Sequence, residues 1–357
     1  MPSNNHFIHS SAGTGKTTKI SKLALRLKSK KILITTYTIE NTQEIIRKIE
    51  KLNGFVPQNI EVITWYNFLL KECVRPYQNK FGIKERINNV IFVNNKSVPF
   101  VKESSLQHYI KEDAVYSDKL SKFAYNCNTR NNNCIVNRLE KCYDFIFIDE
   151  AQDLSGYDFS WVDCLLSSSC FVTLVGDARQ NTFNTTPSSK DKVFSKNILE
   201  YFKLKVEKGY GKLYHMNRSW RCNDAICKFS DKLFPDFPAT LSNNFKKTHH
   251  DGIFLVNTSD LDAYCKQFNP KILLWSKTSK DKIGNKEAIN IGISKGCTYD
   301  RVLIVPTQPM LKFLQSNTPL SSPYKFYIAV TRAKYSVSFL IDKKIKCCHP
   351  EIEIWTK

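Results

Sequence analysis

Short apolar runs bounded by polar residues recur along the first 200 positions of the chain. Five of these runs, rich in β-branched and aromatic side chains, lie at residues 7–9, 32–36, 60–64, 145–149 and 171–175. Because apolar residues follow one another without alternation, both faces of each strand are expected to be buried, as in a parallel sheet. Helical periodicity follows at residues 16–28 and 40–51. The pattern predicts a doubly wound α/β domain.

A second series of strand-like runs begins after residue 210. Its members lie at residues 212–215, 253–256, 272–275, 301–306 and 336–341. Between about residues 72 and 140 the pattern weakens into polar, Asn-rich and Lys-rich sequence, which predicts a small, mostly helical insertion. We therefore expect a first domain at residues 1–205, with the insertion at about 72–140, and a second domain at residues 206–357.

The net charge of the chain indicates the class of partner that it binds. The 357 residues include 53 Lys and Arg against 33 Asp and Glu, a formal net charge of +20. A balance this basic attracts a polyanion such as nucleic acid or a membrane surface. The 12 Gly and 13 Pro are too few for a collagen-like or disordered chain, and a hydrophobic content of 42% is that of a globular protein.

The 12 cysteines are scattered and form no C-x-x-C motif. The chain shows no basic start followed by an apolar stretch, and no later segment of about 18 apolar residues. We therefore expect an intracellular protein with reduced thiols, cytoplasmic or associated with the nucleoid or nucleus, and no membrane partner. Cys127, Cys134 and Cys142, and separately residues 347–349, leave a metal site open as an alternative to buried free thiols.

Residues 9–18, HSSAGTGKTT, follow the first predicted strand and open the first predicted helix. This is the context of a P-loop, in which a glycine-rich turn directs backbone N–H groups at a phosphate chain. Gly13 and Gly15 allow close approach, Lys16 supplies a charge to the β- and γ-phosphates, and the Thr17 hydroxyl is placed to bind Mg²⁺. The expected nucleotide contacts are Ser11, Ala12, Gly13, Thr14, Gly15, Lys16, Thr17 and Thr18.

Residues 143–153, YDFIFIDEAQD, place two adjacent carboxylates at the end of an apolar strand. The carboxyl end of a parallel strand is where α/β sheets bind ligands. Asp149 is expected to hold Mg²⁺, and Glu150 to polarise the attacking water, as hydrolysis of a nucleoside triphosphate requires. Together the two motifs predict a nucleoside triphosphatase.

The P-loop followed by Asp-Glu-Ala-Gln-Asp resembles superfamily 1 helicases, and more closely their UvrD/Rep-like branch. Further motifs follow in the order of that family: LVGDARQ at 174–180, SWRCNDAI at 219–226, ISKGCTYDRV at 293–302 and YIAVTRAK at 327–334. The resemblance implies an α/β fold of two RecA-like P-loop domains with parallel sheets. It also implies ATP and Mg²⁺ as cofactors.

The resemblance assigns roles in the later motifs. Gln180 would sense the γ-phosphate and couple it to the bound strand, and Trp220 would stack on adenine. Arg221 would reach the γ-phosphate, with Arg218 as a rival for that role, and Arg332 would act as an arginine finger. Since both arginines lie in the second domain, hydrolysis would require the two domains to close on one nucleotide. The implied catalytic residues are Lys16, Glu150, Gln180, Arg221 and Arg332, and the implied ATP contacts beyond the P-loop are Trp220, Arg221, Gly296 and Arg332.

Contacts to a single strand are expected at strand ends of the first domain and in the second. Residues 36–38 resemble the family's T-F-T and residues 64–68 its T-F-H-S-F. Aromatic rings at such positions serve as platforms on which bases stack. Trp65 and Phe68 fit a buried core better than a contact surface. The expected strand contacts are Thr36, Tyr37, Thr64, Tyr66, Phe183, Lys277 and Lys295.

Two departures from the family pattern bear on activity. Gly292 and Thr298 stand where the family has His and Glu, which is typical of RecD-like and viral branches and leaves the polarity of movement open. The accessory insertions of UvrD-like helicases are reduced, so unwinding by the chain alone is a weaker expectation than hydrolysis stimulated by a strand.

We expect an ATP-dependent helicase or translocase that moves on single-stranded nucleic acid, with DNA as the expected strand. The resemblance to the UvrD/Rep-like branch favours movement in the 3′→5′ direction. One alternative is an ATP-gated nucleic-acid-binding effector, without processive unwinding, that controls a partner protein such as a nuclease. Another is an RNA helicase of viral type.

Overall fold

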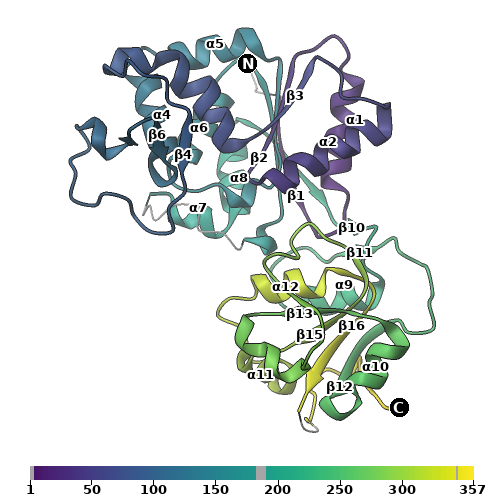
Figure 1. Cartoon of the computed structure of the whole chain (residues 1–357). Coiled ribbons are helices and arrows are strands. Elements are labelled where there is room, and N and C mark those ends of the chain that lie inside the picture. The colour runs from purple at the N-terminus through teal and green to yellow at the C-terminus, as the bar shows by residue number, and fades with distance from the viewer. Residues whose placement is uncertain (1–3, 182–189, 343–344) are drawn as a thin grey trace. The chain divides into compact units, whose positions relative to one another are not determined.

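Two six-stranded sheets organise the chain (Figure 1). The structure is a computed structural model that describes residues 4–181, 190–342 and 345–357, with only the backbone at 277–279. Packing divides the chain into one unit of Met1–His9 with Lys16–His215, and a second of Ser10–Gly15 with Met216–Lys357. The pairings given below confirm the expected α/β class with parallel sheets.

The first sheet has the strand order β3-β2-β7-β8-β1-β9. Its members are β1 (Asn5–Ser10), β2 (Ile32–Thr36), β3 (Ile60–Thr64), β7 (Phe145–Ile148), β8 (Phe171–Gly176) and β9 (Gly211–Met216). The first five of these strands in spatial order, from β3 to β1, pair in parallel. Their carboxyl ends therefore meet at one edge, where the turns that follow β1, β7 and β8 carry the motif residues.

The position of the edge strand β9 differs from the expected domain division. The pattern at residues 212–215 predicts a strand of the second domain, but β9 lies beside β1 in the first sheet. Gly211 permits this pairing, because a Cβ at that position would clash with the carbonyl of Asn5. The strand is largely solvated, as an edge strand is, so its pattern alone did not show which sheet it joins. The first unit accordingly extends to His215.

Helices α1 (Lys16–Arg26), α2 (Ile39–Asn53), α6 (Tyr157–Leu166) and α8 (Ile198–Glu207) alternate with these strands. The ends of α2 show why such helices form where they do. Thr38 caps its start by accepting a hydrogen bond from the Asn41 backbone N–H at 3.1 Å. Gly54 ends it in a left-handed conformation with φ of +87°. Shorter described helices outside the insertion are η4 (Ala151–Asp153), η5 (Ala178–Gln180) and α7 (Lys192–Lys196).

The insertion is helical at both ends and carries a small sheet in its middle. Helix α3 (Trp65–Phe68) follows β3 and leads into the insertion. The helical parts of the insertion are a π-helix η1 (Leu69–Val74), η2 (Arg75–Phe81), η3 (Leu106–His108), α4 (Ser117–Thr129) and α5 (Cys134–Cys142). The sheet has the order β4-β6-β5, formed by Asn89–Ile91, Ala114–Tyr116 and Ile110–Lys111. Strands of two or three residues give too little alternation to be read from the sequence.

The second sheet has the order β14-β13-β15-β16-β12-β17, and all of its pairings are parallel. Its strands are β12 (Gly252–Asn257), β13 (Lys271–Leu274), β14 (Ala288–Asn290), β15 (Tyr299–Val305), β16 (Ala333–Ile341) and β17 (Ile352–Trp355). A separate pair joins β10 (Arg218–Ser219) to β11 (Leu241–Ser242). The helices are α9 (Asp224–Asp231), η6 (Thr258–Asp260), α10 (Leu261–Phe268), η7 (Lys277–Ile283), α11 (Gln308–Ser316) and α12 (Tyr324–Val330).

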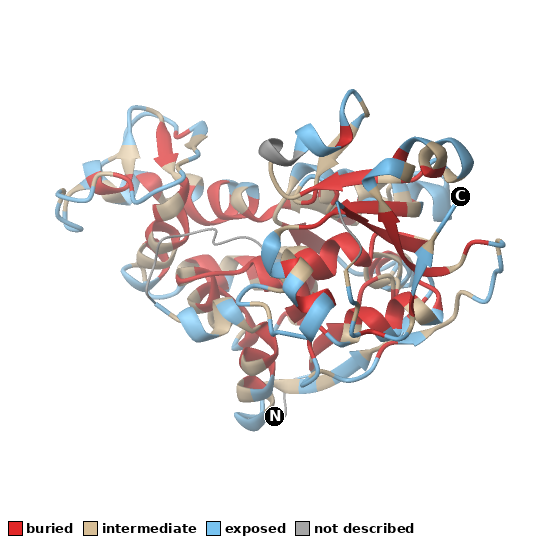
Figure 2. Ribbon diagram, turned by 90° about the horizontal axis from the view of Figure 1, so that it is seen from below, coloured by how far each residue is buried: buried red, intermediate tan, exposed pale blue. Residues whose placement is uncertain are grey.

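Both faces of the second sheet are covered. On β15, Val302 and Ile304 pack into one apolar cluster, and Leu303 and Val305 pack into another. Successive side chains of a strand point to opposite faces, so the continuous apolar run fills two cores. Figure 2 shows buried residues along the strands and exposed residues on the outer surfaces of the helices. Among the described residues, no helix is both long enough and apolar enough to cross a membrane.

Candidate functional site

The turn between β1 and α1 has the conformation that a glycine-rich phosphate loop needs. Gly13 and Gly15 both adopt left-handed conformations, with φ of +73° and +82°. Thr14 Oγ1 donates to the Ser11 carbonyl at 3.1 Å and closes the turn. Lys16 opens α1, and Thr17 and Thr18 occupy its first turn, where backbone N–H groups lack helical partners and attract anions.

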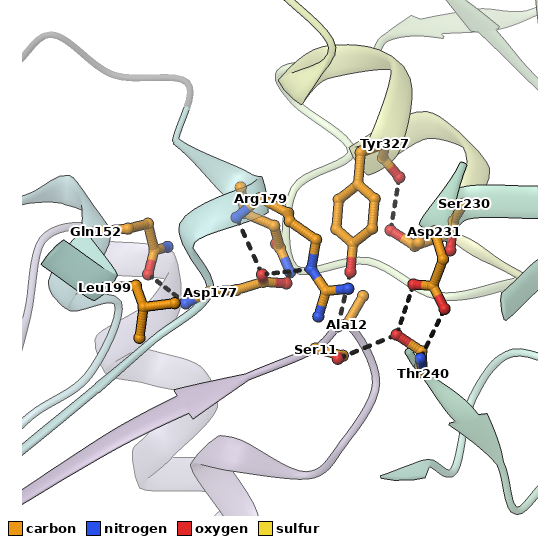
Figure 3. Close-up of polar contacts among 12 residues, drawn as sticks. Ser11, Ala12, Gln152, Asp177, Arg179, Leu199, Ser230, Asp231, Thr240 and Tyr327 are labelled. Carbon is orange, nitrogen blue, oxygen red and sulfur yellow. Dashed lines mark hydrogen bonds and ion pairs between the residues drawn. The ribbon is translucent and has the colours of Figure 1, made fainter. Parts of the chain in front are cut away.

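Within the second unit, neighbouring groups hold residues of this turn. Ala12 donates its backbone N–H to the Tyr327 hydroxyl at 3.1 Å. The Ser11 hydroxyl accepts a hydrogen bond from Thr240 Oγ1 at 3.1 Å, and Thr240 is held in turn by Asp231 (Figure 3). Because the Ala12 N–H is one of the groups expected to face a phosphate chain, the Tyr327 hydroxyl occupies a position that a nucleotide would compete for.

The start of α1 faces the two carboxylates that follow β7. Lys16 Nζ lies 3.2 Å from Glu150 Oε1, and Thr17 Oγ1 donates to Asp149 Oδ2 at 3.0 Å. The side chains of Lys16 and Glu150 are only 10% and 14% exposed, so little water screens their attraction. Two motifs more than 130 positions apart in the sequence therefore meet at the carboxyl edge of the first sheet.

Backbone geometry sets Asp149 and Glu150 apart from ordinary turn residues. The Asp149 N–H donates to the Thr35 carbonyl at 2.9 Å, which extends the pairing of β7 with β2 by one residue. Glu150 adopts a left-handed conformation with φ of +54°, which is strained for a residue with a side chain. This turn directs the Glu150 carboxylate toward Lys16.

Burial and neighbouring charges both shift the pKa values of Lys16 and Asp149. Burial by itself lowers the pKa of Lys16, but the carboxylates of Glu150, Asp177 and Asp149 outweigh it, and the pKa is raised. Burial, and then the neighbouring Glu150 carboxylate, raise the pKa of Asp149. The lysine is therefore held as a cation, and a further positive charge beside Asp149 would be stabilising.

Asp149 and Thr17 fit a magnesium ion. Their oxygens are the hard ligands that Mg²⁺ takes. The two oxygens lie side by side, joined by the 3.0 Å hydrogen bond that Thr17 donates, so both would be available to one ion. The buried carboxylate carries the charge that such an ion would neutralise.

A chain of hydrogen bonds links the acidic turn to the turn after β8. Gln152 Nε2 donates to Glu150 Oε2, and Gln152 Oε1 accepts the Asp177 N–H at 3.0 Å. Asp177 then accepts from Gln180 Nε2 at 2.8 Å. It also pairs with Arg179 Nε at 3.3 Å (Figure 3). The structure thus connects Gln180 to Glu150 through two intermediates.

Gln152 and Arg179 received no role in the sequence analysis, although both stand inside motifs quoted there. Gly176 leaves room for the contact between Gln152 Oε1 and the Asp177 N–H, because a Cβ at Gly176 would lie 2.9 Å from Gln152 Oε1. The only signal in the sequence was a Gln two positions after the acidic pair, which by itself does not indicate its partner.

In the second unit, Arg221 and Arg332 meet around the turn that ends α12. Arg221 Nη1 donates to the Thr331 carbonyl at 3.2 Å. Arg332 is 2% exposed, and it donates from Nε to the Ile328 carbonyl at 3.1 Å and from Nη1 to the Cys297 carbonyl at 3.2 Å. Trp220 is 68% exposed, and its backbone N–H donates to the Gly13 carbonyl at 2.9 Å. Gly296 lies in an exposed turn with φ of +89°.

The predicted strand contacts are placed as follows. Tyr37 and Tyr66, both half-buried, meet edge to face with ring centroids 5.7 Å apart. Thr36 is buried, and Thr64 caps α3 by accepting from the Asn67 N–H at 3.2 Å. Lys295 is half-buried. Phe183 lies outside the described residues, as does the side chain of Lys277, whose backbone begins η7.

The cysteines do not form a metal site in the part of the chain that the structure describes. No group of three or more His, Cys, Asp or Glu side chains gathers there around a common point. Cys127 is buried and Cys134 and Cys142 are half-buried, all as free thiols. Burial raises the pKa of Cys127 to about 12, which keeps it protonated and unreactive.

Comparisons with known proteins agree with the motifs. The UvrD/REP helicase N-terminal domain model matches residues 70–184. A protein named "Probable DNA helicase II homolog", from Mycoplasma capricolum subsp. capricolum, is 25% identical over 162 residues. That match covers 45% of this chain and 20% of the relative, so the matched segment spans about a fifth of that protein's length.

Solved helicase structures are also similar at low identity. The PRRSV helicase has a TM-score of 0.45 at 16% identity, covering 95% of this chain and 52% of that one. Arterivirus nonstructural protein 10, a helicase solved in complex with DNA, has a TM-score of 0.45 at 13% identity, covering 94% of this chain and 61% of that one. The domain match and the order of its motifs make the chain similar to UvrD-like proteins of helicase superfamily 1.

Proposed function

We propose that this chain is an ATP-driven motor that moves along single-stranded nucleic acid. The proposed strand is DNA, and the resemblance to the UvrD/Rep-like branch favours the 3′→5′ direction. The observation that carries the proposal is the pairing of Lys16 and Thr17 with the carboxylates after β7. A cation and a hydroxyl at the start of a helix, facing two carboxylates, form the set that Mg²⁺-dependent phosphoryl transfer uses.

Lys16 is proposed to bind the β- and γ-phosphates of ATP in the turn formed by residues 11–15. Bound phosphates would compete with Glu150 for the lysine ammonium group, because the two anions need the same donor. Release from Lys16 leaves the Glu150 carboxylate available to accept a proton from the attacking water. Gln152 would keep that carboxylate oriented, through the hydrogen bond it donates to Oε2.

Thr17 and Asp149 are proposed to hold Mg²⁺, which when bound neutralises charge on the phosphates. Gln180 is proposed to report the state of the γ-phosphate, and its bond to Asp177 supports a link from Glu150 to the rest of the first unit. From the second unit, the resemblance supports Arg332 as the group that stabilises the transition state, and Arg221 as a γ-phosphate contact. A correctly placed arginine of this kind is worth roughly 10³–10⁵ in rate.

Trp220 is proposed to stack on the adenine, for which its exposed ring is suited, with Gly296 close to the nucleotide. Contacts to the strand are proposed for Tyr37 and Tyr66, whose rings adjoin at the carboxyl edge of the first sheet. The remaining proposed strand contacts are Thr36, Thr64, Phe183, Lys277 and Lys295.

The test is the ATPase rate of the purified chain, alone and with oligo-dT or oligo-U of equal length. We expect a slow basal rate that a single strand stimulates, and loss of turnover in Lys16→Ala. Direction is read from displacement of streptavidin from a 3′ or a 5′ biotin. Turnover in Lys16→Ala close to that of wild type would overturn the assignment of the site.

Two other outcomes would redirect the proposal. Tight strand binding with slow hydrolysis that ignores the strand would favour an ATP-gated effector acting on a partner such as a nuclease. Stronger stimulation by oligo-U than by oligo-dT would favour an RNA helicase.

A further inference from the structure

Three aromatic rings form a row that runs from the end of β2 into the insertion. Tyr37 follows β2, Tyr66 lies in α3, and Phe92 follows β4. The ring centroids of Tyr37 and Tyr66 are 5.7 Å apart, and those of Tyr66 and Phe92 are 5.5 Å apart. Interplanar angles of 83° and 87° make both contacts edge to face, an arrangement that orients each ring. Phe92 is 72% exposed, so the row ends in solvent.

The segment that follows Phe92 is tied to the first turn of α4. The Val93 N–H donates to Ser117 Oγ at 3.2 Å. Ser97 donates to Asp118 twice, from its N–H at 3.0 Å and from its hydroxyl at 2.6 Å. These hydrogen bonds order the segment next to the exposed ring. Less conformational entropy is therefore lost when the ring contacts a ligand.

The other end of the row is tied to the same helix. One turn further along α4, Ser121 donates to the buried carboxylate of Asp158. Asp158 also accepts from the Tyr37 hydroxyl and, at 2.7 Å, from Trp65 Nε1. Helix α4 therefore fixes Phe92 relative to Tyr37, although the two residues belong to different parts of the unit.

Basic residues flank the exposed end of the row along the chain. Arg86 and Lys96 lie on either side of β4 and Phe92 in the chain, and both are exposed. Neither forms an ion pair within the described residues. Arg75 donates to the carbonyls of Ile87 and Asn88 at the start of β4. Burial, and then the charge of Arg86, lower the pKa of Arg75, which indicates two guanidinium groups near one another. Exposed basic residues close in the chain to an exposed aromatic ring suit a polyanion whose bases stack.

We propose that Phe92 stacks on a base of the single strand, so that the insertion extends the strand contacts made by Tyr37 and Tyr66. The inference rests on the proposed function, because it assigns one more residue to the same strand. A single strand, rather than an apolar peptide, is the occupant that matches one exposed ring at the end of a row that begins at the sheet edge, with exposed basic residues before and after it in the chain.

The test compares Phe92→Ala with Phe100→Ala in the full chain. Phe100 lies in the same insertion and is 97% exposed, and within the described residues its ring meets no other ring. Binding is measured by fluorescence anisotropy of labelled oligo-dT at several salt concentrations. We expect Phe92→Ala to weaken binding about 5- to 150-fold, the range for loss of one stacking platform. Phe100→Ala should bind as wild type does.

Two further readouts separate stacking from a structural effect. Phe92→Trp should restore binding, because it replaces the stacking surface. The dependence of log Kd on log salt should be the same in Phe92→Ala and wild type, since no cation is removed. Equal affinities of Phe92→Ala and Phe100→Ala, with strand binding intact in wild type, would overturn this inference alone. Absence of strand binding in wild type would overturn the proposed function itself.

Discussion

Lys16 and Glu150 form an ion pair of 3.2 Å at the carboxyl edge of the first sheet, and both side chains are largely buried. The pair joins the residue expected to bind phosphate to the residue expected to activate water. In the structure each partner satisfies the other, and burial makes this more than a surface contact.

Replacing the Glu150 carboxylate tests its proposed role in activating water. Glu150→Gln keeps an oxygen that can accept from Lys16, so the fold and nucleotide binding are expected to persist. The amide cannot take a proton from water, and the strand-stimulated ATPase rate should fall by about 10²- to 10⁴-fold. The matched control is Asp144→Asn at the opposite end of β7, where the carboxylate forms an exposed pair with Lys30 at 3.1 Å. ATPase assays in which Glu150→Gln turns over as fast as Asp144→Asn would contradict the assignment.

Asp158 holds elements of the insertion against the sheet edge. Its buried carboxylate accepts from Trp65, Tyr37, Ser121 and the Ser155 N–H. Asp158→Ala would leave these buried donors without an acceptor, and we expect the free energy of unfolding to fall by about 3 kcal/mol.

Urea denaturation of the Asp158→Ala variant measures that loss, and Ser121→Ala provides the comparison. Removing the Ser121 hydroxyl deletes a single donor and leaves the carboxylate its other partners, so its cost should be about 1 kcal/mol. Equal losses in the two variants would show that Asp158 does not act as the common acceptor.

Alanine substitutions at two neighbouring glycines test the pairing of β9 with β1 in the first sheet. At Gly211 a Cβ would meet the Asn5 carbonyl, whereas at Gly209 nothing lies within 4 Å of the Cβ position. Gly209→Ala should lower the stability by about 1 kcal/mol, the strain of an alanine in a left-handed backbone with φ of +78°. Gly211→Ala must also push β9 away from β1, so thermal unfolding should show at least twice that destabilisation. A smaller effect at Gly211 than at Gly209 would argue against this pairing.

His250 makes the stability of the second unit depend on pH. Its imidazole is stacked between the rings of Phe254 and Phe268, at centroid distances of 4.0 and 3.7 Å, and bonds to the Tyr264 hydroxyl. Burial, and then the charge of Arg301, lower the pKa of His250 to about 4. Between that value and 6.5, the unfolded chain binds a proton that the folded chain does not.

His250 therefore contributes stability above pH 6.5 that is lost as the pH falls toward 4, by at most about 3 kcal/mol. His250→Phe keeps an aromatic ring in the stack and removes the titration. Urea denaturation at pH 7.5 and 4.5 should show a larger acid-induced loss of stability in wild type than in the variant. Identical losses in both proteins would show that this imidazole does not titrate as described.

Much of the first unit was predictable because its signals are local. Apolar runs gave β1, β2, β3, β7 and β8, and the glycine-rich turn before Lys16 gave the start of α1. Parallel strands imply one edge at which Lys16 and Glu150 would meet, and the structure brings them together there. The roles assigned to these residues remain predictions that the ATPase measurements decide.

Other features were not predictable, since they depend on partners distant in the sequence. The sheet of the insertion consists of strands too short to show alternation, and Asp158 carries no motif. Its importance appears only where α3, α4 and α6 converge on one carboxylate. The exposed ring of Phe92 likewise gained significance from its contact with Tyr66.

The sequence by itself determined the class of fold, the glycine-rich turn before Lys16 and the acidic strand end, because backbone conformation and side-chain periodicity are set by neighbouring residues. Only the tertiary structure decided that β9 joins the first sheet, that Gln152 connects Glu150 to Asp177, and that α4 supports both ends of the aromatic row. Those relationships come from close packing between segments far apart in the chain, and a linear pattern does not specify which segments meet.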